Sequence, residues 1–215
     1  MDTKREILNS AEALFARSGY HASSMRAITE NAGVNLALAN YHFGSKEALL
    51  EAVIARRLRP VNDLRLKRLQ EIRKRSEERN AMPDIEEILR AFIEPVFGSR
   101  ESEKGWADFT NLIGRAFAES DETVQKILLR HMKPVNQMML DMLKDALPGV
   151  SGEEVSWRYQ FLIGALGRAI RVNSSPGYGR LMKNFEVGSE RLIGMLVSFA
   201  GAGMETSVNR VRRMK

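Results

Sequence analysis

Apolar residues recur at helical spacing along almost the whole chain of 215 residues, and no convincing alternating strand pattern interrupts them. An apolar stripe over residues 7–15 predicts a first helix that stops at Gly19. Ser24 is suited to cap a second helix that ends near Gly33, and a third segment runs to Phe43. The pattern predicts an all-α protein with three short helices before a longer fourth.

The remaining pattern predicts longer helices. Ser45 is suited to cap the fourth helix, which Pro60 would kink or end, and Pro134 would bend or divide another helix. These further helices are expected at about 84–98, 105–119, 122–147, 153–173 and 181–202. Three domains are therefore predicted: an N-terminal helical domain over 1–48, a larger helical domain over 49–202 and a basic tail over 203–215.

Composition narrows the class of protein. Hydrophobic residues make up 44% and charged residues 28% of the chain, as in ordinary globular proteins. The sequence has no cysteine, which excludes disulfides and thiolate metal sites. No uncharged apolar run reaches the length of about 18 residues that a membrane span needs, and the N-terminus lacks an apolar secretory core. We therefore expect a cytoplasmic protein that does not enter membranes.

The net charge of +6 favours an anionic partner, although a merely basic protein is nearly as compatible with it. One segment beyond Pro60 concentrates basic residues and interleaves them with acids. A solvated helical face is favoured over a binding surface for this segment. Its basic residues are Arg65, Lys67, Arg68, Arg73, Lys74, Arg75 and Arg79.

One stretch, GVNLALANYHFGSK, is expected to have two different faces. It starts at Gly33, where glycine tolerates the positive φ of a sharp turn between helices. On a helical wheel, Ala39 and Phe43 share one side, while Ala37 and Tyr41 lie nearly opposite. The small alanine allows close helix crossing and the phenylalanine adds bulk to the core. The segment therefore predicts the third helix of a helix-turn-helix, packed on one side and presented to a partner on the other.

The outward side carries groups suited to double-stranded DNA. Asn40 offers both a donor and an acceptor to a base edge, and methyl-bearing neighbours can meet thymine methyls. Tyr41, His42 and Lys46 are suited to phosphate oxygens. Arg26, at the start of the second predicted helix, can reach a phosphate or a guanine.

Residues 4–54 resemble the N-terminal DNA-binding domain of the tetracycline-repressor (TetR) family. The matching motifs are LF-x-x-x-GY at the end of the first helix, AGV at the turn and YHFGSKEAL leading into the fourth helix. The resemblance implies a helix-turn-helix DNA-binding domain followed by a ligand-binding and dimerisation domain. The DNA contacts that it implies are Ser24, Arg26, Leu36, Ala37, Leu38, Asn40, Tyr41, His42 and Lys46.

Some of these positions depart from the family pattern. Most relatives place an aromatic residue where Asn40 stands, and Leu36 and Leu38 replace residues that are often polar. Fewer direct hydrogen bonds to bases are therefore available. Discrimination between operators is expected to depend mainly on methyl contacts, on Arg26 and on DNA shape.

The last two predicted helices carry apolar stripes and small residues suited to dimerisation. The resemblance implies that they pair with their symmetry mates in a four-helix bundle, and this reading is favoured over an intrachain core. The candidate interface residues are Leu162, Leu166, Ile170, Phe185, Leu192, Leu196 and Phe199.

The helical body between these regions is rich in methionine and aromatic residues, most of which are expected to be core. By resemblance, this body holds a pocket for a small-molecule effector. The candidate lining residues are Trp106, Phe109, His131, Met138, Trp157 and Phe161. The wording ANYHFGSKEAL is similar to the branch that contains fatty-acid-responsive regulators, which suggests a fatty acid or acyl-CoA.

Together these features predict a ligand-responsive regulator that binds a palindromic operator as a homodimer and changes its DNA affinity when the effector binds. Repression is favoured over activation, and neither a cofactor nor a metal is expected. Catalysis is disfavoured because His21, His42 and His131 are far apart and no carboxylate pair stands out. The alternative is a basic helical protein that binds DNA or anionic surfaces without sequence preference, and whose binding would weaken steeply with salt.

Overall fold

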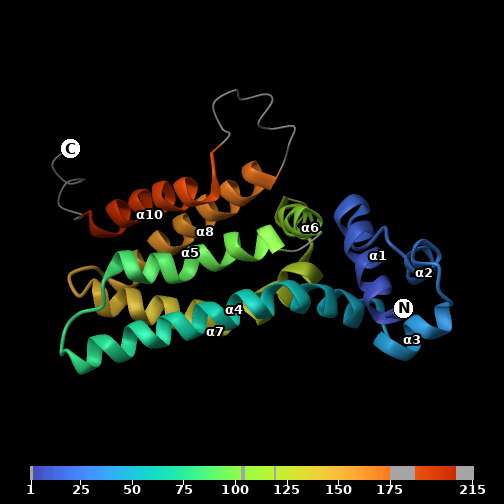
Figure 1. Cartoon of the computed structure of the whole chain (residues 1–215), viewed down its shortest axis with the longest axis horizontal. Helices are drawn as coiled ribbons and strands as arrows, with labels where there is room; N and C mark the ends of the chain where they lie inside the picture. The colour runs from blue at the N-terminus through green and yellow to red at the C-terminus, as the bar shows by residue number, and fades with distance from the viewer. Residues whose placement is uncertain (1, 103–104, 119, 175–186, 207–215) are drawn as a thin grey trace. The chain divides into compact units, whose positions relative to one another are not determined.

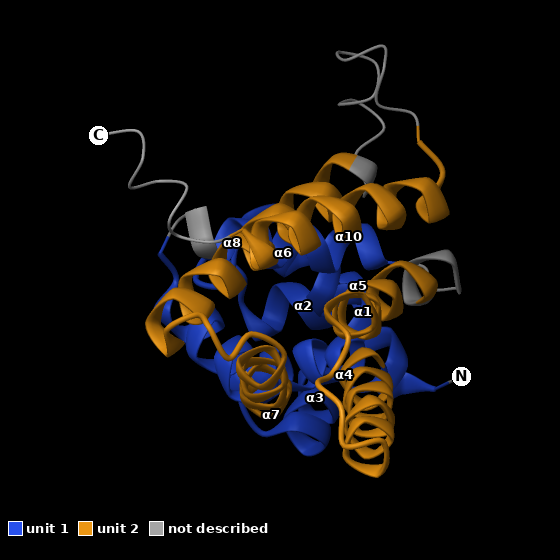
Figure 2. Cartoon of the chain, turned by 90° about the vertical axis from the view of Figure 1, so that its left-hand side faces the viewer, with its two compact units in different colours: residues 1–60, 102–132 blue, residues 61–101, 133–215 orange. Residues whose placement is uncertain are grey.

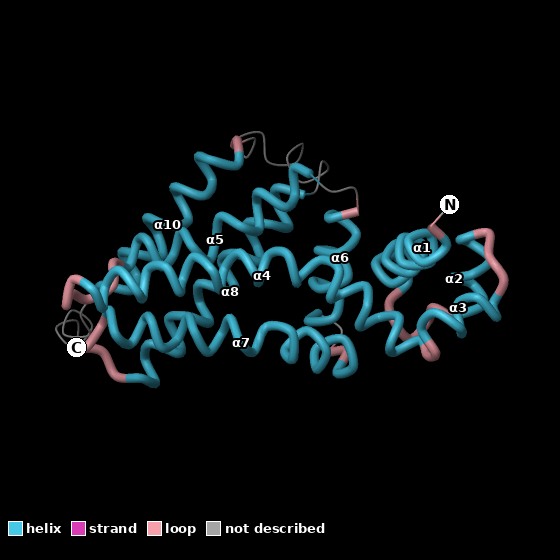
Figure 3. Tube along the Cα trace, turned by 60° about the horizontal axis from the view of Figure 1, so that its bottom comes forward, coloured by secondary structure: helices cyan, strands magenta, loops and turns pink. Residues whose placement is uncertain are grey.

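The structure, a computed structural model, describes residues 2–102, 105–118, 120–174 and 187–206. Within these ranges every regular element is an α-helix, as Figures 1 and 3 show. The predicted all-α fold class is therefore confirmed. None of the described helices combines the length and apolar character needed to cross a membrane.

The first three helices end, and α2 and α4 begin, where the local signals predicted. Their bounds are α1 Thr3–Ser18, α2 Met25–Ala32, α3 Leu36–Phe43 and α4 Lys46–Glu78. The Ser24 hydroxyl caps α2 by accepting from the Ala27 N–H at 3.0 Å, and the Ser45 hydroxyl caps α4 in the same way. Gly33 ends α2 with φ 66°, the left-handed conformation for which glycine was expected there.

The later helices are longer than α2 and α3. Helix α4 continues past Pro60, and α7 continues past Pro134, so neither proline ends its helix. Helix α10 reaches Glu205, inside the segment predicted as a tail, while residues 207–215 lie outside the described ranges. The bounds are α5 Ile85–Ser102, α6 Trp106–Ala118, α7 Glu122–Ala146, α8 Gly152–Ser174 and α10 Ser189–Glu205.

By packing, the chain divides into two compact units (Figure 2). Unit 1 comprises residues 1–60 and 102–132, and unit 2 comprises residues 61–101 and 133–215. Helices α4 and α7 each contribute residues to both units. The division at residues 48 and 202 proposed from the sequence concerns function and stays a prediction.

Unit 1 is built around α1, which packs against α2, α3 and α6. Its core includes Ile7 and Phe15 of α1, both fully buried. Polar bonds also join α1 to α2: the Ser10 hydroxyl donates to the Ile28 carbonyl at 2.7 Å and accepts from the Asn31 side chain at 2.9 Å. Each buried polar atom in this contact therefore has a partner, as a close helix crossing requires.

A buried ion pair joins α1 to α4 within the same unit. The Glu12 carboxylate accepts hydrogen bonds from Nε and Nη2 of Arg57, both at 2.7 Å, and a further bond from Arg56. Gly105, just before α6, has φ 96°, and a Cβ built on it would lie 2.7 Å from Arg57 Nη2. Three segments far apart in sequence therefore meet at one guanidinium.

Unit 2 has a core of aromatic and aliphatic residues from α5, α7 and α8, and α10 packs on α8. The predicted solvated face over residues 65–79 is wrong for Arg65, which is only 3% exposed. Arg65 follows Val61 and precedes Leu69 at four-residue intervals, so it lies on the buried stripe of α4. Because charged residues surround Arg65 in the sequence, this buried stripe was not recognised from the charge pattern.

Glu12→Gln is expected to lower the free energy of unfolding by about 3–5 kcal/mol, because it removes the carboxylate charge from a buried ion pair that joins α1 to α4. Urea unfolding followed by circular dichroism measures this change. Glu122→Gln is the matched control, since it breaks only the exposed Glu122–Lys126 pair and should leave the unfolding midpoint unchanged. Equal effects of the two substitutions would show that the Glu12 ion pair does not hold α1 on α4.

Candidate nucleic-acid interface

Helix α3 has one buried side and one exposed side. Ala39 is fully buried, whereas the Tyr41 side chain is 83% exposed. Ala37, Leu38 and Asn40 are also exposed. Phe43 is only half-buried, so Ala39 alone carries the closely packed contact expected of both residues. The helix thus presents most of its surface to solvent.

Local capping explains why so short a segment is helical. The Asn35 side chain accepts from the Ala37 N–H at 2.8 Å, and Gly44, with φ 73°, ends the helix. The Val34 N–H donates to the Thr29 carbonyl at 3.0 Å, which fixes the turn between α2 and α3. Side-chain and turn bonds therefore hold the exposed face of α3 in place before any ligand binds.

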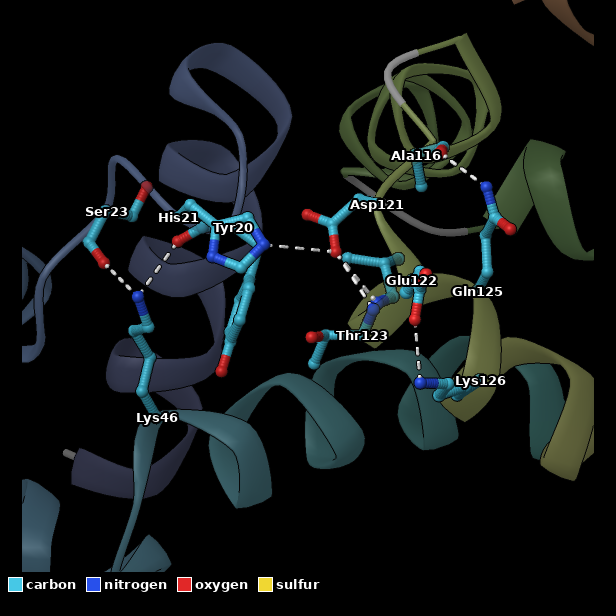
Figure 4. A network of polar contacts seen from close by, with 11 residues as sticks. Tyr20, His21, Ser23, Lys46, Ala116, Asp121, Glu122, Thr123, Gln125 and Lys126 are labelled. Carbon is cyan, nitrogen blue, oxygen red and sulfur yellow. Dashed lines mark hydrogen bonds and ion pairs between the residues drawn. The ribbon is translucent and has the colours of Figure 1, made fainter.

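Lys46 is engaged inside the protein. Its ammonium group donates to the carbonyls of Tyr20 at 3.1 Å and Ser23 at 3.0 Å, as Figure 4 shows. The same Nζ atom lies 4.3 Å from the centre of the Tyr20 ring, a cation–π contact. Burial, more than the charges of Glu47 and Asp121, raises the pKa of the Tyr20 hydroxyl. Lys46 therefore anchors the start of α4 to the turn between α1 and α2.

A second contact in Figure 4 joins that turn to the start of α7. His21 Nε2 lies 3.5 Å from Asp121 Oδ1. The same carboxylate oxygen accepts from the backbone N–H groups of Thr123 and Val124 at 3.1 and 3.2 Å. Asp121 therefore caps α7 and also faces the turn that precedes α2. In Figure 4, Lys46 and Asp121 lie on opposite sides of the Tyr20-His21 pair.

Ser24 and Arg26 lie exposed at the start of α2, the helix that precedes α3 in the sequence. Arg26 Nε is 3.0 Å from Glu30 Oε1 in an exposed pair one turn apart. Exposed ion pairs of this kind contribute little to stability, so Arg26 can exchange Glu30 for a phosphate at a small cost in free energy. His42 is exposed beside Tyr41, with the two rings 5.3 Å apart.

The residues predicted to line an effector pocket are divided between the two units. Trp106 and Phe109 are buried neighbours in unit 1, with ring centres 5.4 Å apart, and His131 of the same unit faces Glu51 at 3.5 Å. The other three, Met138, Trp157 and Phe161, belong to unit 2. The last two are 58% and 67% exposed on α8. The helical spacing of apolar residues along α8 did not distinguish the side that faces solvent from the side that faces the core.

Three of the seven predicted dimer residues lie inside the chain. Leu162, Leu166 and Leu196 are buried, so for these three the intrachain alternative holds and their assignment to an interface is corrected. Ile170 and Leu192 are half-buried, and Phe185 lies outside the described residues. The large apolar side chains that remain exposed on α8 and α10 are Trp157, Phe161, Met195 and Phe199. Of these, only Phe199 was predicted to lie at an interface.

A groove of about 380 Å³ lies between α5 and α10 in unit 2. Glu86 and Arg90 line it and pair with each other at 2.9 Å, and much of its remaining wall consists of small residues of α10. None of the residues predicted to bind an effector lines this groove.

Two family models match the chain. Residues 7–53 match the bacterial regulatory proteins of the tetR family, and residues 90–203 match the tetracyclin repressor-like C-terminal domain. The chain belongs to the TetR family. The family consists of transcription factors rather than enzymes, which agrees with the expectation from the sequence.

A curated relative is close in sequence to this TetR-family chain over a short segment. The HTH-type transcriptional regulator UidR of Escherichia coli K12 is 40% identical over 52 residues, which span 24% of this chain and 26% of UidR. The alignment thus reaches about a quarter of the length of the curated relative.

Solved TetR-family structures share the fold over nearly the whole chain. PfmR from Thermus thermophilus is 20% identical with a TM-score of 0.58, covering 92% of this chain and 96% of PfmR. The fatty acid degradation regulator FadR from Bacillus halodurans is 15% identical with a TM-score of 0.59, covering 97% of each chain. At these identities the likeness concerns the fold alone.

Ala39→Leu is expected to destabilise unit 1 by about 1–3 kcal/mol, because the buried face of α3 has no room for three further carbons. Ala37→Leu, two residues earlier on the exposed face, should leave the melting temperature unchanged. Thermal unfolding of both variants measures the difference. A melting temperature that falls equally in both would contradict the two-faced arrangement of α3.

Proposed function

We propose that this TetR-family regulator is a ligand-responsive repressor that binds a palindromic operator as a homodimer. Residues 1–48 would read DNA, and the helical body over 49–202 would hold the effector and the dimer interface, with a basic tail over 203–215. The carrying observation is the exposure of Tyr41 opposite the buried Ala39, which leaves one face of α3 free for the major groove.

The proposed DNA contacts divide by chemistry. Asn40 and the methyl groups of Ala37 and Leu38 face bases, because an amide offers a donor–acceptor pair and methyl groups meet thymine. Tyr41 and His42 bind phosphates. Ser24, Arg26 and Leu36 complete the surface from the start of α2 and α3. Lys46 takes a positioning role, since its ammonium group already holds two carbonyls and a ring.

The dimer is proposed to form through the exposed face of α8 and α10. Trp157 and Phe161 lie with their ring centres 6.2 Å apart on α8, and Phe199 is 70% exposed on α10. Exposed aromatic residues of this kind are typical of the buried centre of an interface. Gly164, one turn beyond Phe161, has no atom within 4 Å of a Cβ built on it, so another backbone can approach there. Two heads would then read half-sites about 34 Å apart.

Effector response would follow from linkage. An apolar or acyl ligand that prefers the dimer form unsuited to DNA must weaken operator binding by the same factor by which DNA weakens ligand binding. The methionine- and aromatic-rich core of unit 2 supports an apolar ligand, because methionine side chains repack readily.

Selection from a random double-stranded DNA pool is expected to enrich one short palindrome, because two symmetric heads read the same half-site. Tyr41→Ala should weaken binding to this palindrome about five- to tenfold through loss of a phosphate contact, with an unchanged melting temperature. Fluorescence anisotropy at about 150 mM salt measures the affinity. Met82→Ala, an exposed residue between α4 and α5, is the control.

Failure to enrich any palindrome, with binding that weakens steeply in salt and ignores sequence, would favour the alternative of a nonspecific basic protein. Weakening by Met82→Ala equal to that by Tyr41→Ala would remove α3 as the reading helix.

Phe161→Glu is expected to raise the dimer dissociation constant at least about tenfold, because a charge would be buried at the centre of the interface. Sedimentation velocity over a dilution series measures the change. Met82→Glu places the same charge on another exposed apolar residue of unit 2 and should leave the dimer intact. A Phe161→Glu protein that dimerises like the parent would exclude this face of α8.

A further inference from the structure

Arg65 is a buried cation whose hydrogen-bond partners are all neutral. Its Nε donates to the backbone carbonyl of Phe92 at 2.8 Å, and its Nη1 reaches Asn62 Oδ1 at 3.4 Å. The guanidinium carbon lies 4.0 Å from the centre of the Phe92 ring. Among the described residues no carboxylate pairs with Arg65, and none accepts a bond from its Nη2.

Other arginines of the molecule show the contrast. Arg57, also buried, pairs with the buried carboxylate of Glu12. Arg68, one turn beyond Arg65 on α4, pairs with Glu94 at 2.8 Å. A buried guanidinium is normally accompanied by an anion, because transfer of a lone charge from water costs several kcal/mol. Arg65 departs from that rule in the core of unit 2.

The neighbouring polar groups do not supply a negative charge. Tyr159 of α8 is 1% exposed, its ring packs edge-on against Phe92, and its hydroxyl donates to Asn136 Oδ1 of α7 at 2.7 Å. Burial raises the pKa of this hydroxyl more than the charge of Arg65 lowers it, so Tyr159 stays neutral. Burial lowers the pKa of Arg65 to about 10, which still leaves the guanidinium charged at pH 7.

Four helices therefore converge on a site with a net positive charge and unused donors. Residues of α4, α5, α7 and α8 form it, all within unit 2. Nη2 of Arg65 can still donate, and so can the amide nitrogen of Asn136, because only the Oδ1 of Asn136 has a hydrogen-bond partner. Met139 and Met142 lie one and two turns further along α7 and are fully buried. Their flexible side chains can repack around an apolar group.

We propose that Arg65 anchors the head group of the effector, and that the effector is an apolar molecule with a free carboxylate. This proposal rests on the effector response proposed above and narrows its chemistry. A planar guanidinium matches one carboxylate with two parallel hydrogen bonds and neutralises its single charge. The several phosphate charges of an acyl-CoA exceed what one arginine neutralises in a buried site, so the free acid is favoured over the thioester.

The experiment compares acids with matched alcohols on the whole, unaltered chain. Octanoate, decanoate, dodecanoate, hexadecanoate and phenylbutanoate are each titrated beside the corresponding alcohol and the corresponding CoA thioester, by calorimetry and thermal unfolding. At least one carboxylate should raise the melting temperature by about 5–10 °C at a hundredfold excess over its Kd. Its alcohol and its thioester should bind at least tenfold more weakly.

Arg65→Met should weaken binding of that carboxylate at least tenfold and leave the ligand-free melting temperature equal or higher, because an unpaired buried charge is removed. Arg65→Lys keeps the charge and should retain part of the affinity. Arg68→Met, which removes only the partly exposed pair with Glu94, is the control and should bind like the parent.

Three results would overturn the proposal: no carboxylate of the series binds, the alcohol or thioester binds as tightly as the acid, or Arg65→Met binds as the parent does. Should Arg65→Met fail to fold, the acid–alcohol comparison on the unaltered protein decides. Operator binding is measured on the same preparation. An intact operator affinity without carboxylate binding refutes only the head-group assignment, whereas loss of operator selectivity refutes the regulator itself.

Discussion

The N-terminal half of the molecule depends on one buried group, the carboxylate of Glu12. It lies on α1, the helix that packs on α2, α3 and α6, and it is held by Arg57 and Arg56 of α4. A carboxylate buried without such donors is costly, because a lone charge loses its hydration in the core. Gly105 leaves just enough space for the guanidinium of Arg57. The packing of α1 on α4 therefore depends on the Glu12 ion pairs and on the glycine beside them.

Two buried arginines on α4 have opposite relations to their surroundings. Arg57 has its counter-ion inside the protein, whereas Arg65, about two turns further along, has only carbonyl oxygens and an aromatic ring. A paired buried charge specifies how helices dock, because removal of either partner is costly. An unpaired one leaves free energy that an anion recovers when it binds. Along a single helix, the same residue type thus occurs in two different electrostatic settings, and we propose a ligand-binding role only for the unpaired arginine.

The surface proposed to bind DNA is small and depends on neighbouring residues for its position. Helix α3 has eight residues, too few to be stable alone, and it is held by its Asn35 cap, the Gly44 stop and the burial of Ala39. Lys46 adds to this support by joining the start of α4 to the turn before α2. Exposed Tyr41 and Asn40 owe their positions to these neighbours.

Local signals in the sequence determined the helices, their caps, the turn at Gly33 and the two faces of α3, because each depends on residues a few positions apart. The TetR motifs in the first 54 residues also lie within one contiguous segment. Only tertiary structure decided that Leu162 and Leu196 are buried while Phe161 and Phe199 are exposed, that Lys46 turns inward, and that Arg65 leaves the charged face. Periodicity gives the direction of a side chain from its own helix. Which partner lies in that direction depends on helices far away in the sequence.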